Sequence, residues 1–195
     1  MTPVIEISAG LEAAATAAAA VLRRPGSVVL VPTETVYGLV CRAGDGVARR
    51  RIYELKDRDF AKPLALFAAD WRDLASLAVL DGLPSRLAER YCPGPVTVIA
   101  PGRDGGTVGF RVPDHPFIAR LLGLLDFPLA STSANLSGRP NARSVAAALA
   151  ELDGEPDLAI DGGEIAGEAL ASTVVDATGE TARIIRQGAL RIEGF

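Results

Sequence analysis

The chain has 195 residues, of which 49% are hydrophobic and 23% are charged. These proportions are typical of a soluble globular protein and exclude a disordered, collagen-like or coiled-coil chain. Twenty basic and twenty-four acidic residues give a net charge of -4, which argues against a surface that is basic throughout but allows a local basic patch. Aromatic residues make up only 5%, so stacking platforms for single-stranded nucleic acid are not expected.

The first quarter of the chain predicts strands that alternate with a helix. Residues 4–7 and 27–31 are expected to be strands, and the unbroken apolar run of the second is typical of a strand buried on both faces. Between them, residues 11–23 predict an alanine-rich helix that a Pro-Gly pair ends. The loop 33–38 follows the second strand at its carboxyl end, where open α/β sheets bind ligands.

The rest of the chain continues this pattern less regularly. The expected elements are a helix capped by Asp45, a strand at 64–67, a short helix capped by Asp70, a helix opened by Pro84, strands at 96–100 and 107–112, a helix capped by Asp114, a strand at 127–131, a helix from Ser144, and strands near Leu158, Val174 and Ile184.

Paired strands in the middle and at the end of the chain favour a mixed sheet over a strictly parallel one. We therefore predict an α/β fold, with a mixed, twisted open sheet covered by helices, and a single domain over residues 1–195. The two cysteines, Cys41 and Cys92, are too few to crosslink a secreted scaffold and match no zinc spacing. The apolar run 13–22 is too short to span a bilayer, so we expect a cytoplasmic protein without membrane contact.

The common nucleotide, metalloprotease and hydrolase motifs are missing from the sequence. Four loops instead carry hydroxyls or cations, the groups that hold phosphate and carboxylate oxygens. These loops contain Thr33, Glu34 and Thr35; Lys56, Asp57, Arg58 and Lys62; Arg111; and Ser131, Thr132, Ser133, Ala134 and Asn135.

Each of these loops also has a simpler interpretation. Lys56 and Arg58 are two residues apart, so in an extended segment both would point to one face and could bracket an anion that Lys62 also reaches. A solvated basic strip after a helix explains the same residues. Ser131 and Ser133 share this spacing, and they form either a ligand site or a polar turn.

Glu34 and His115 also leave two interpretations each. Glu34, inside a loop of hydroxyls, either helps to place a metal or satisfies a turn. His115 is the only histidine, which excludes a mechanism that needs two, and it is favoured as a structural residue over a general base.

Six segments occur in one order along most of the chain and together resemble the threonylcarbamoyl-AMP synthase family, in its single-domain form. They are PTETVYGL at 32–39, KxR at 56–58, PGPVT at 93–97, RVPDH at 111–115, STSANLSG at 131–138 and STVVD at 172–176. The resemblance implies a YrdC-like fold. It also implies an enzyme that joins L-threonine, bicarbonate and ATP into threonylcarbamoyl-AMP with release of pyrophosphate, for the threonylcarbamoyl-adenosine modification of transfer RNA.

The resemblance also implies roles for particular residues. The family commonly has histidine where this chain has Phe67, and serine where it has Asn141. Implied threonine-site residues are Thr35, Phe67, Arg111, Ser131 and Ser172; implied ATP-site residues are Arg58, Lys62, Thr107, Ser133, Asn141 and Arg186; and the implied catalytic residues are Lys56, Arg58, Ser133 and Asn135, which complete the KxR and SxN pairs.

The implied reaction needs no activated side-chain nucleophile, since the substrates supply the reacting atoms. Catalysis would depend on positioning and on electrostatic preorganisation. Magnesium is expected to bridge the phosphate oxygens of ATP and to keep much of its water, so no metal-binding side chains are predicted. Expected partners are downstream proteins of transfer-RNA modification, and a contact with transfer RNA itself is a further candidate that the sequence leaves open.

Three alternatives remain at this point. The first is a related paralogue that binds a nucleotide or RNA without making the adenylate, and Phe67 favours it. The second is a carbamoyl-transferring module of a larger enzyme, although the zinc-finger and acylphosphatase-like segments of such enzymes are missing. The third is a binder of double-stranded RNA, which the acidic balance disfavours.

Overall fold

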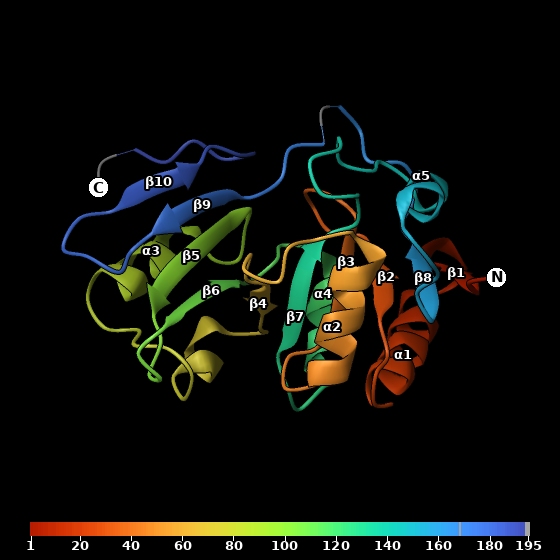
Figure 1. Cartoon of the computed structure of the whole chain (residues 1–195), viewed down its shortest axis with the longest axis horizontal. Helices are drawn as coiled ribbons and strands as arrows, with labels where there is room; N and C mark the ends of the chain where they lie inside the picture. Colours follow the sequence, from red (N-terminus) through yellow and green to blue (C-terminus); the bar gives the residue numbers. More distant parts are fainter. Residues whose placement is uncertain (168, 194–195) are drawn as a thin grey trace.

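One mixed sheet runs through the molecule and carries helices on its faces (Figure 1). The computed structural model describes residues 1–167 and 169–193. In these residues the strands are β1 Val4–Glu6, β2 Val29–Val31, β3 Gly38–Arg42, β4 Ala65–Phe67, β5 Val96–Pro101, β6 Thr107–Arg111, β7 Leu129–Ser133, β8 Leu158–Asp161, β9 Thr173–Asp176 and β10 Arg183–Arg186. The α-helices are α1 Leu11–Leu22, α2 Gly46–Leu55, α3 Leu83–Tyr91, α4 Pro116–Gly123 and α5 Val145–Glu151, and short 3-10 helices cover Ile7–Ala9 (η1) and Trp71–Leu74 (η2).

The ten described strands lie in the order β1-β8-β2-β3-β7-β4-β6-β5-β9-β10. The pairs β1/β8, β2/β8, β4/β6 and β5/β9 are parallel, whereas β2/β3, β3/β7, β4/β7, β5/β6 and β9/β10 are antiparallel. The predicted mixed open sheet is therefore confirmed, with β1 and β10 at its two edges.

Two local predictions differ from the structure. Strand β3 was not expected, because it follows directly on the loop 33–37 without a separate turn signal, yet four of its five residues are buried. The short helix predicted after Asp70 is confirmed as a 3-10 helix, and the Asp70 side chain caps it. The predicted Asp114 cap of α4 is wrong, because His115 is the N-cap and its side chain makes no capping hydrogen bond. Pro116 follows as the first helical residue, and since proline has no backbone N–H, that position needs no hydrogen-bond acceptor.

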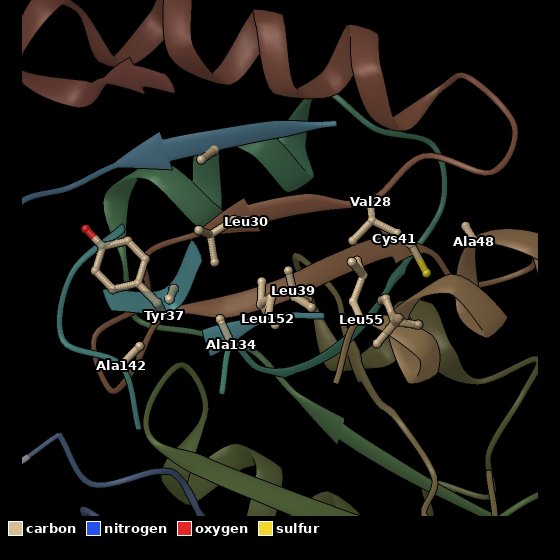
Figure 2. Close-up of a cluster of buried hydrophobic side chains, with 14 of the residues drawn as sticks. Val28, Leu30, Tyr37, Leu39, Cys41, Ala48, Leu55, Ala134, Ala142 and Leu152 are labelled. Atoms are coloured by element: carbon tan, nitrogen blue, oxygen red, sulfur yellow. The ribbon is translucent and has the colours of Figure 1, made fainter. Parts of the chain in front are cut away.

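The core is built on both faces of the central strands. Val28 and Leu30 of the β2 segment face one cluster, with α2 and α5, while Val29 and Val31 face another, with α1 and α4. Figure 2 shows the first cluster, in which Leu30 lies beside Leu39, its partner on β3. This two-sided burial explains the unbroken apolar run of the strand. No helix of the described residues is long and apolar enough to cross a membrane.

The other half of the sheet is packed on one face and hollowed on the other. In β5, Val96, Val98 and Ala100 belong to a third cluster that includes residues of α3 and η2. The intervening Thr97 and Ile99 line a cavity instead. Because successive side chains of a strand point to opposite faces, one strand serves both the core and the site.

The predicted Asp45 cap of α2 is confirmed. Its carboxylate accepts hydrogen bonds from the backbone N–H groups of Val47 and Ala48, both at 3.0 Å, and from Gly26 N at 2.6 Å. The cap thus joins the start of α2 to the turn before β2. Bonds from Ala48 and Gly26 are the main reason why the pKa of the Asp45 carboxyl lies below its usual value.

We expect Asp45→Ala to destabilise the protein by about 1–2 kcal/mol, because helix N–H groups lose their acceptor. Urea unfolding measures the loss, and Asp45→Ser, which retains a cap, should lose less. The depressed pKa makes this contribution present above the unfolded pKa of about 3.9 and lost as the pH falls through the folded value. An unchanged urea midpoint in Asp45→Ala at pH 7 would contradict the assignment.

Candidate active site

A cavity of about 250 Å³ lies over the strands between β3 and β10. Side chains from loops and strands far apart in the sequence meet in its wall. Of the residues singled out from the sequence, it is lined by Arg58, Phe67, Thr107, Arg111, Ser131, Ser133, Ser172 and Arg186. Implied threonine-site and ATP-site residues thus share one hollow.

The charged side chains that line this cavity are all positive. Arg58, Arg111 and Arg186 all line it, and no Asp or Glu is among its described lining residues. Burial lowers the pKa of Arg186, and the charges of Arg111 and Arg58 lower it further. Burial also lowers the pKa of Arg58. These guanidiniums repel one another in a partly desolvated space. A bound anion would therefore offset the free-energy cost of this repulsion and of the burial of charge.

Arg111 is fixed in orientation by three neighbours. Its Nε donates to Gly94 O at 3.1 Å, its Nη1 donates to Thr35 Oγ1 at 3.0 Å, and its Nη2 lies 2.7 Å from Glu34 Oε1. A guanidinium has five N–H donors, so these contacts do not use all of them, although Nη2 itself is buried. Glu34 Oε1 also accepts from Asp114 N at 2.9 Å. Of the two interpretations of Glu34, these contacts favour the structural one, in which the carboxylate accepts a hydrogen bond from the loop backbone and pairs with the Arg111 guanidinium.

Thr35 lies behind the cavity wall and is held by Thr33. Thr33 Oγ1 donates to Val36 O at 2.7 Å and accepts from the backbone N–H groups of Thr35 and Val36. The two threonine hydroxyl oxygens are 2.9 Å apart. Since the Thr33 hydrogen is used on Val36, Thr35 donates to Thr33 and accepts from Arg111. Thr33 lines the cavity, and it was a candidate from its hydroxyl-bearing loop but not among the residues implied by the resemblance.

Arg186, Ser172 and Thr97 form a second fixed group. Arg186 donates to the Ser172 carbonyl through Nε at 3.2 Å and Nη2 at 2.8 Å, and Nη2 also lies 3.2 Å from Ser172 Oγ. The Ser172 and Thr97 hydroxyl oxygens are 2.8 Å apart. Thr97 was missed as a site residue, and its signal was a lone hydroxyl in an otherwise apolar strand.

Close backbone contact positions this group. A Cβ on Gly188 would lie 2.2 Å from Ala171 O, so only glycine allows the segment after β10 to press on the start of β9. Gly188 N donates to Thr173 Oγ1 at 3.0 Å, which closes the contact.

Lys56 is not a lining residue of the cavity. Its side chain is 1% exposed, and its Nζ donates to the carbonyl oxygens of Ser133 and Asn135. The interpretation that Lys56 and Arg58 bracket one anion from an extended segment is wrong, because Asp57 between them has a φ of 45° and turns the chain. Lys56 therefore holds the loop after β7 through its hydrogen bonds to Ser133 and Asn135, outside the cavity, whereas Arg58 lines the cavity.

Three further implied residues lie outside the lining. Lys62 is exposed, and its carbonyl accepts from Arg58 Nε at 3.3 Å. Asn141 Nδ2 donates to Ala169 O at 2.8 Å. Asn135 is buried, and its Nδ2 donates to two carbonyls of its own loop, at 3.0 and 2.7 Å. Their implied roles stay predictions.

His115 is also outside the lining residues. It is partly buried, and burial lowers its pKa while the charges of Glu34 and Asp114 oppose the shift. Its Nδ1 is buried and has no hydrogen-bond partner within the described residues. This placement, as the N-cap of α4, accords with a structural residue.

Comparison with known proteins shows the family to which the chain belongs. A family described as "Telomere recombination" (Sua5, YciO and YrdC) matches residues 21–188. A threonylcarbamoyl-AMP synthase of Chromohalobacter salexigens is 42% identical over 178 residues, with 85% of this chain and 94% of that protein covered. The threonylcarbamoyl-AMP synthase of Pyrococcus abyssi is 36% identical over 203 residues, with 99% of this chain covered.

Solved structures of the same family have a similar fold. Pyrococcus abyssi Sua5 complexed with L-threonine has a TM-score of 0.84 and 32% identity, and covers 96% of this chain and 57% of that one. Escherichia coli YciO has a TM-score of 0.85 and 27% identity, and 96% of each chain is covered. The chain spans 59% of the length of the Pyrococcus synthase, while it matches YciO nearly end to end. Fold, motifs and relatives agree that this chain belongs to the Sua5/YciO/YrdC family, whose homologues include threonylcarbamoyl-AMP synthases.

Proposed function

We propose that the protein is a threonylcarbamoyl-AMP synthase, which condenses L-threonine, bicarbonate and ATP to threonylcarbamoyl-AMP and pyrophosphate. The observation that carries the proposal is the cavity in which three guanidiniums and several hydroxyls meet without a lining carboxylate. Such a lining suits a triphosphate next to a carboxylate. The relatives named as threonylcarbamoyl-AMP synthases support the same activity.

L-Threonine is assigned to the Arg111 end of the cavity. The guanidinium of Arg111 lines the cavity and suits a carboxylate ligand, and its contacts with Gly94, Thr35 and Glu34 hold it still. Ser131 Oγ donates to Ala65 O at 3.2 Å, which leaves its oxygen free to accept from an amine. Phe67 lies with its ring centre 5.7 Å from the Arg111 guanidinium carbon and adds an apolar wall. The related Sua5 structure with L-threonine supports this class of substrate.

The phosphates of ATP are assigned to the Arg58 and Arg186 end. Both guanidiniums line the cavity, and Thr107 and Ser133 add hydroxyls there. Arg186 is held by Ser172, and Arg58 by the carbonyls of Lys62 and Pro63. These contacts fix the cations before the ligand binds, which lowers the reorganisation needed during the reaction.

The chemistry balances without a covalent enzyme intermediate. The threonine amine adds to bicarbonate with loss of water to form a carbamate. A carbamate oxygen then attacks the α-phosphorus of ATP, and the bond to the β-phosphate oxygen breaks to release pyrophosphate. Negative charge stays on the phosphates throughout, where fixed guanidiniums stabilise it.

Magnesium enters this proposal with the nucleotide. Residues 1–167 and 169–193 hold no cluster of three His, Cys, Asp or Glu side chains that could bind a metal ion, and the cavity wall offers hydroxyls and cations. These residues fit a magnesium ion that is bound mainly by phosphate oxygens and water. When bound, the ion would neutralise charge on the triphosphate.

The product is an activated carbamoyl group, which a downstream transfer-RNA-modifying protein would consume. A direct contact with transfer RNA stays a prediction. The alternative function, a paralogue that binds nucleotide or RNA without making the adenylate, is favoured by one feature, the apolar Phe67 in the cavity wall. The two functions differ in one testable way, since only the synthase needs threonine to release pyrophosphate from ATP.

With ATP, magnesium, bicarbonate and L-threonine, the protein should release pyrophosphate, and omission of threonine should abolish the release. Serine in place of threonine should support a slower reaction, because it lacks the methyl group that an apolar wall such as Phe67 contacts. A coupled pyrophosphate assay measures all three rates. Equal rates with and without threonine would favour the nucleotide-binding alternative.

Arg58→Ala should lower the rate of pyrophosphate release by about a hundredfold, because one fixed donor of the phosphate site is lost. Arg50→Ala is a matched control, since Arg50 is exposed on α2, outside the lining, and its loss changes the net charge equally. Steady-state kinetics compare the two variants. Full activity in Arg58→Ala would show that Arg58 does not act on the phosphates.

A further inference from the structure

Strand β10 contains a bulge that sets the direction of the Arg186 side chain. Ile184 pairs with Val175 and Arg186 pairs with Val174, so Ile185 between them is the extra residue of the bulge. Paired residues of an antiparallel ladder lie on the same face of the sheet. Val175 belongs to the buried third cluster, whereas Val174 lines the cavity. The bulge therefore puts Arg186 on the cavity face, where a strand in regular register would put Ile185.

The end of β10 is not fixed by core packing. All four residues of this strand are exposed, and the strand lies at one edge of the sheet. A long side chain in such a place loses its conformational freedom only through specific contacts. Arg186 makes them with Ser172, whose carbonyl accepts from Nη2 at 2.8 Å. The position of its charge thus depends on how the end of β10 lies against the start of β9.

Thr173 ties the segment after β10 to the start of β9. Its side chain is fully buried, and its hydroxyl oxygen accepts from Gly188 N at 3.0 Å while the hydroxyl hydrogen is donated to Leu190 O. Between these two residues, Ala189 N donates to Ala171 O at 2.9 Å. Three hydrogen bonds thus join the two segments, and two of them use one side-chain oxygen.

Both ends of this contact adjoin residues of the site. Arg186 lies two residues before Gly188, and Ser172 lies directly before Thr173. Ser172 lines the cavity, whereas Thr173 is not among its described lining residues. Loss of the Thr173 hydroxyl would leave Gly188 N and Leu190 O without this partner. The segment that carries Arg186 would then be free to shift relative to Ser172.

We propose that Thr173 is a positioning residue, whose hydroxyl holds the bulged end of β10 so that the Arg186 guanidinium faces the phosphates of the bound nucleotide. The placement of phosphates beside Arg186 rests on the proposed function. The role of Thr173 requires only that ATP binds there, and it does not require that pyrophosphate is released.

Calorimetric titration with ATP and magnesium tests the proposal without turnover. Thr173→Val removes the hydroxyl and keeps the shape of the side chain. The dissociation constant for ATP should rise about tenfold, because a guanidinium that is no longer held in place is a weaker charged donor. The dissociation constant for L-threonine, which is assigned to the Arg111 end, should not change. Thr173→Ser, which keeps the hydroxyl, should restore most of the affinity for ATP.

Thr2→Val is the matched control. Thr2 is also a buried threonine whose hydroxyl donates to a carbonyl, that of Pro156 at 3.1 Å, and it is not a lining residue of the cavity. Its affinity for ATP should equal that of the parent protein. A general loss of folded protein would lower the number of binding sites in the titration and leave the dissociation constant unchanged. Unaltered ATP affinity in Thr173→Val, or an equal loss in Thr2→Val, would overturn the proposal.

A double-mutant cycle tests whether Thr173 acts through Arg186. Arg186→Ala should weaken ATP binding by more than Thr173→Val does, and Thr173→Val added to Arg186→Ala should have no further effect. Two effects that multiply independently would show that Thr173 does not act through this guanidinium.

Amide hydrogen exchange, followed by NMR, tests the contact itself. Exchange at Gly188 N should be about tenfold faster in Thr173→Val than in the parent protein, because the N–H loses its acceptor. An unchanged exchange rate would contradict the contact. If the ATP affinities behave as expected and the parent protein releases no pyrophosphate, the proposed function is refuted and the role of Thr173 stands. A parent protein that does not bind ATP would refute both.

Discussion

The mutual repulsion of three arginine side chains in one small cavity is the constraint on which the site depends. Arg58, Arg111 and Arg186 come from a loop and two strands, and no carboxylate of the described residues lines the space between them. Folding brings these like charges together in a protein whose net charge is -4. The fold holds an unfavourable arrangement that an anionic ligand would stabilise, which is the kind of electrostatic preorganisation that the proposed function needs.

The scaffold stabilises that arrangement with neutral acceptors and one acid outside the wall. Arg186 is held by Ser172, Arg58 by backbone carbonyls, and Arg111 by Thr35 and by Glu34 behind it. Carbonyl and hydroxyl oxygens orient Arg58 and Arg186 without neutralising them, so the charge of these two guanidiniums stays available to a ligand, whereas Glu34 offsets part of the charge of Arg111. Strand alternation makes this possible, because the same strands face a packed core on their other side.

Much of this was predictable from the sequence, for physical reasons that differ from residue to residue. The Asp45 cap and the doubly buried strand before the first loop follow from local rules, and the motifs located most of the lining residues. The position of Lys56 was not predictable, because it depends on the turn at Asp57 and on carbonyls more than 70 residues away. Long-range pairing with β7 likewise hid the third strand.

The central claim is that one cavity holds threonine and ATP side by side and joins them through a carbamate. Mass spectrometry of the product formed from ¹³C-labelled bicarbonate, L-threonine and ATP tests it most directly. The account predicts an adenylate that contains threonine, AMP and the labelled carbon together. An unlabelled adenylate, or AMP formed without any threonine-containing adenylate, would contradict it.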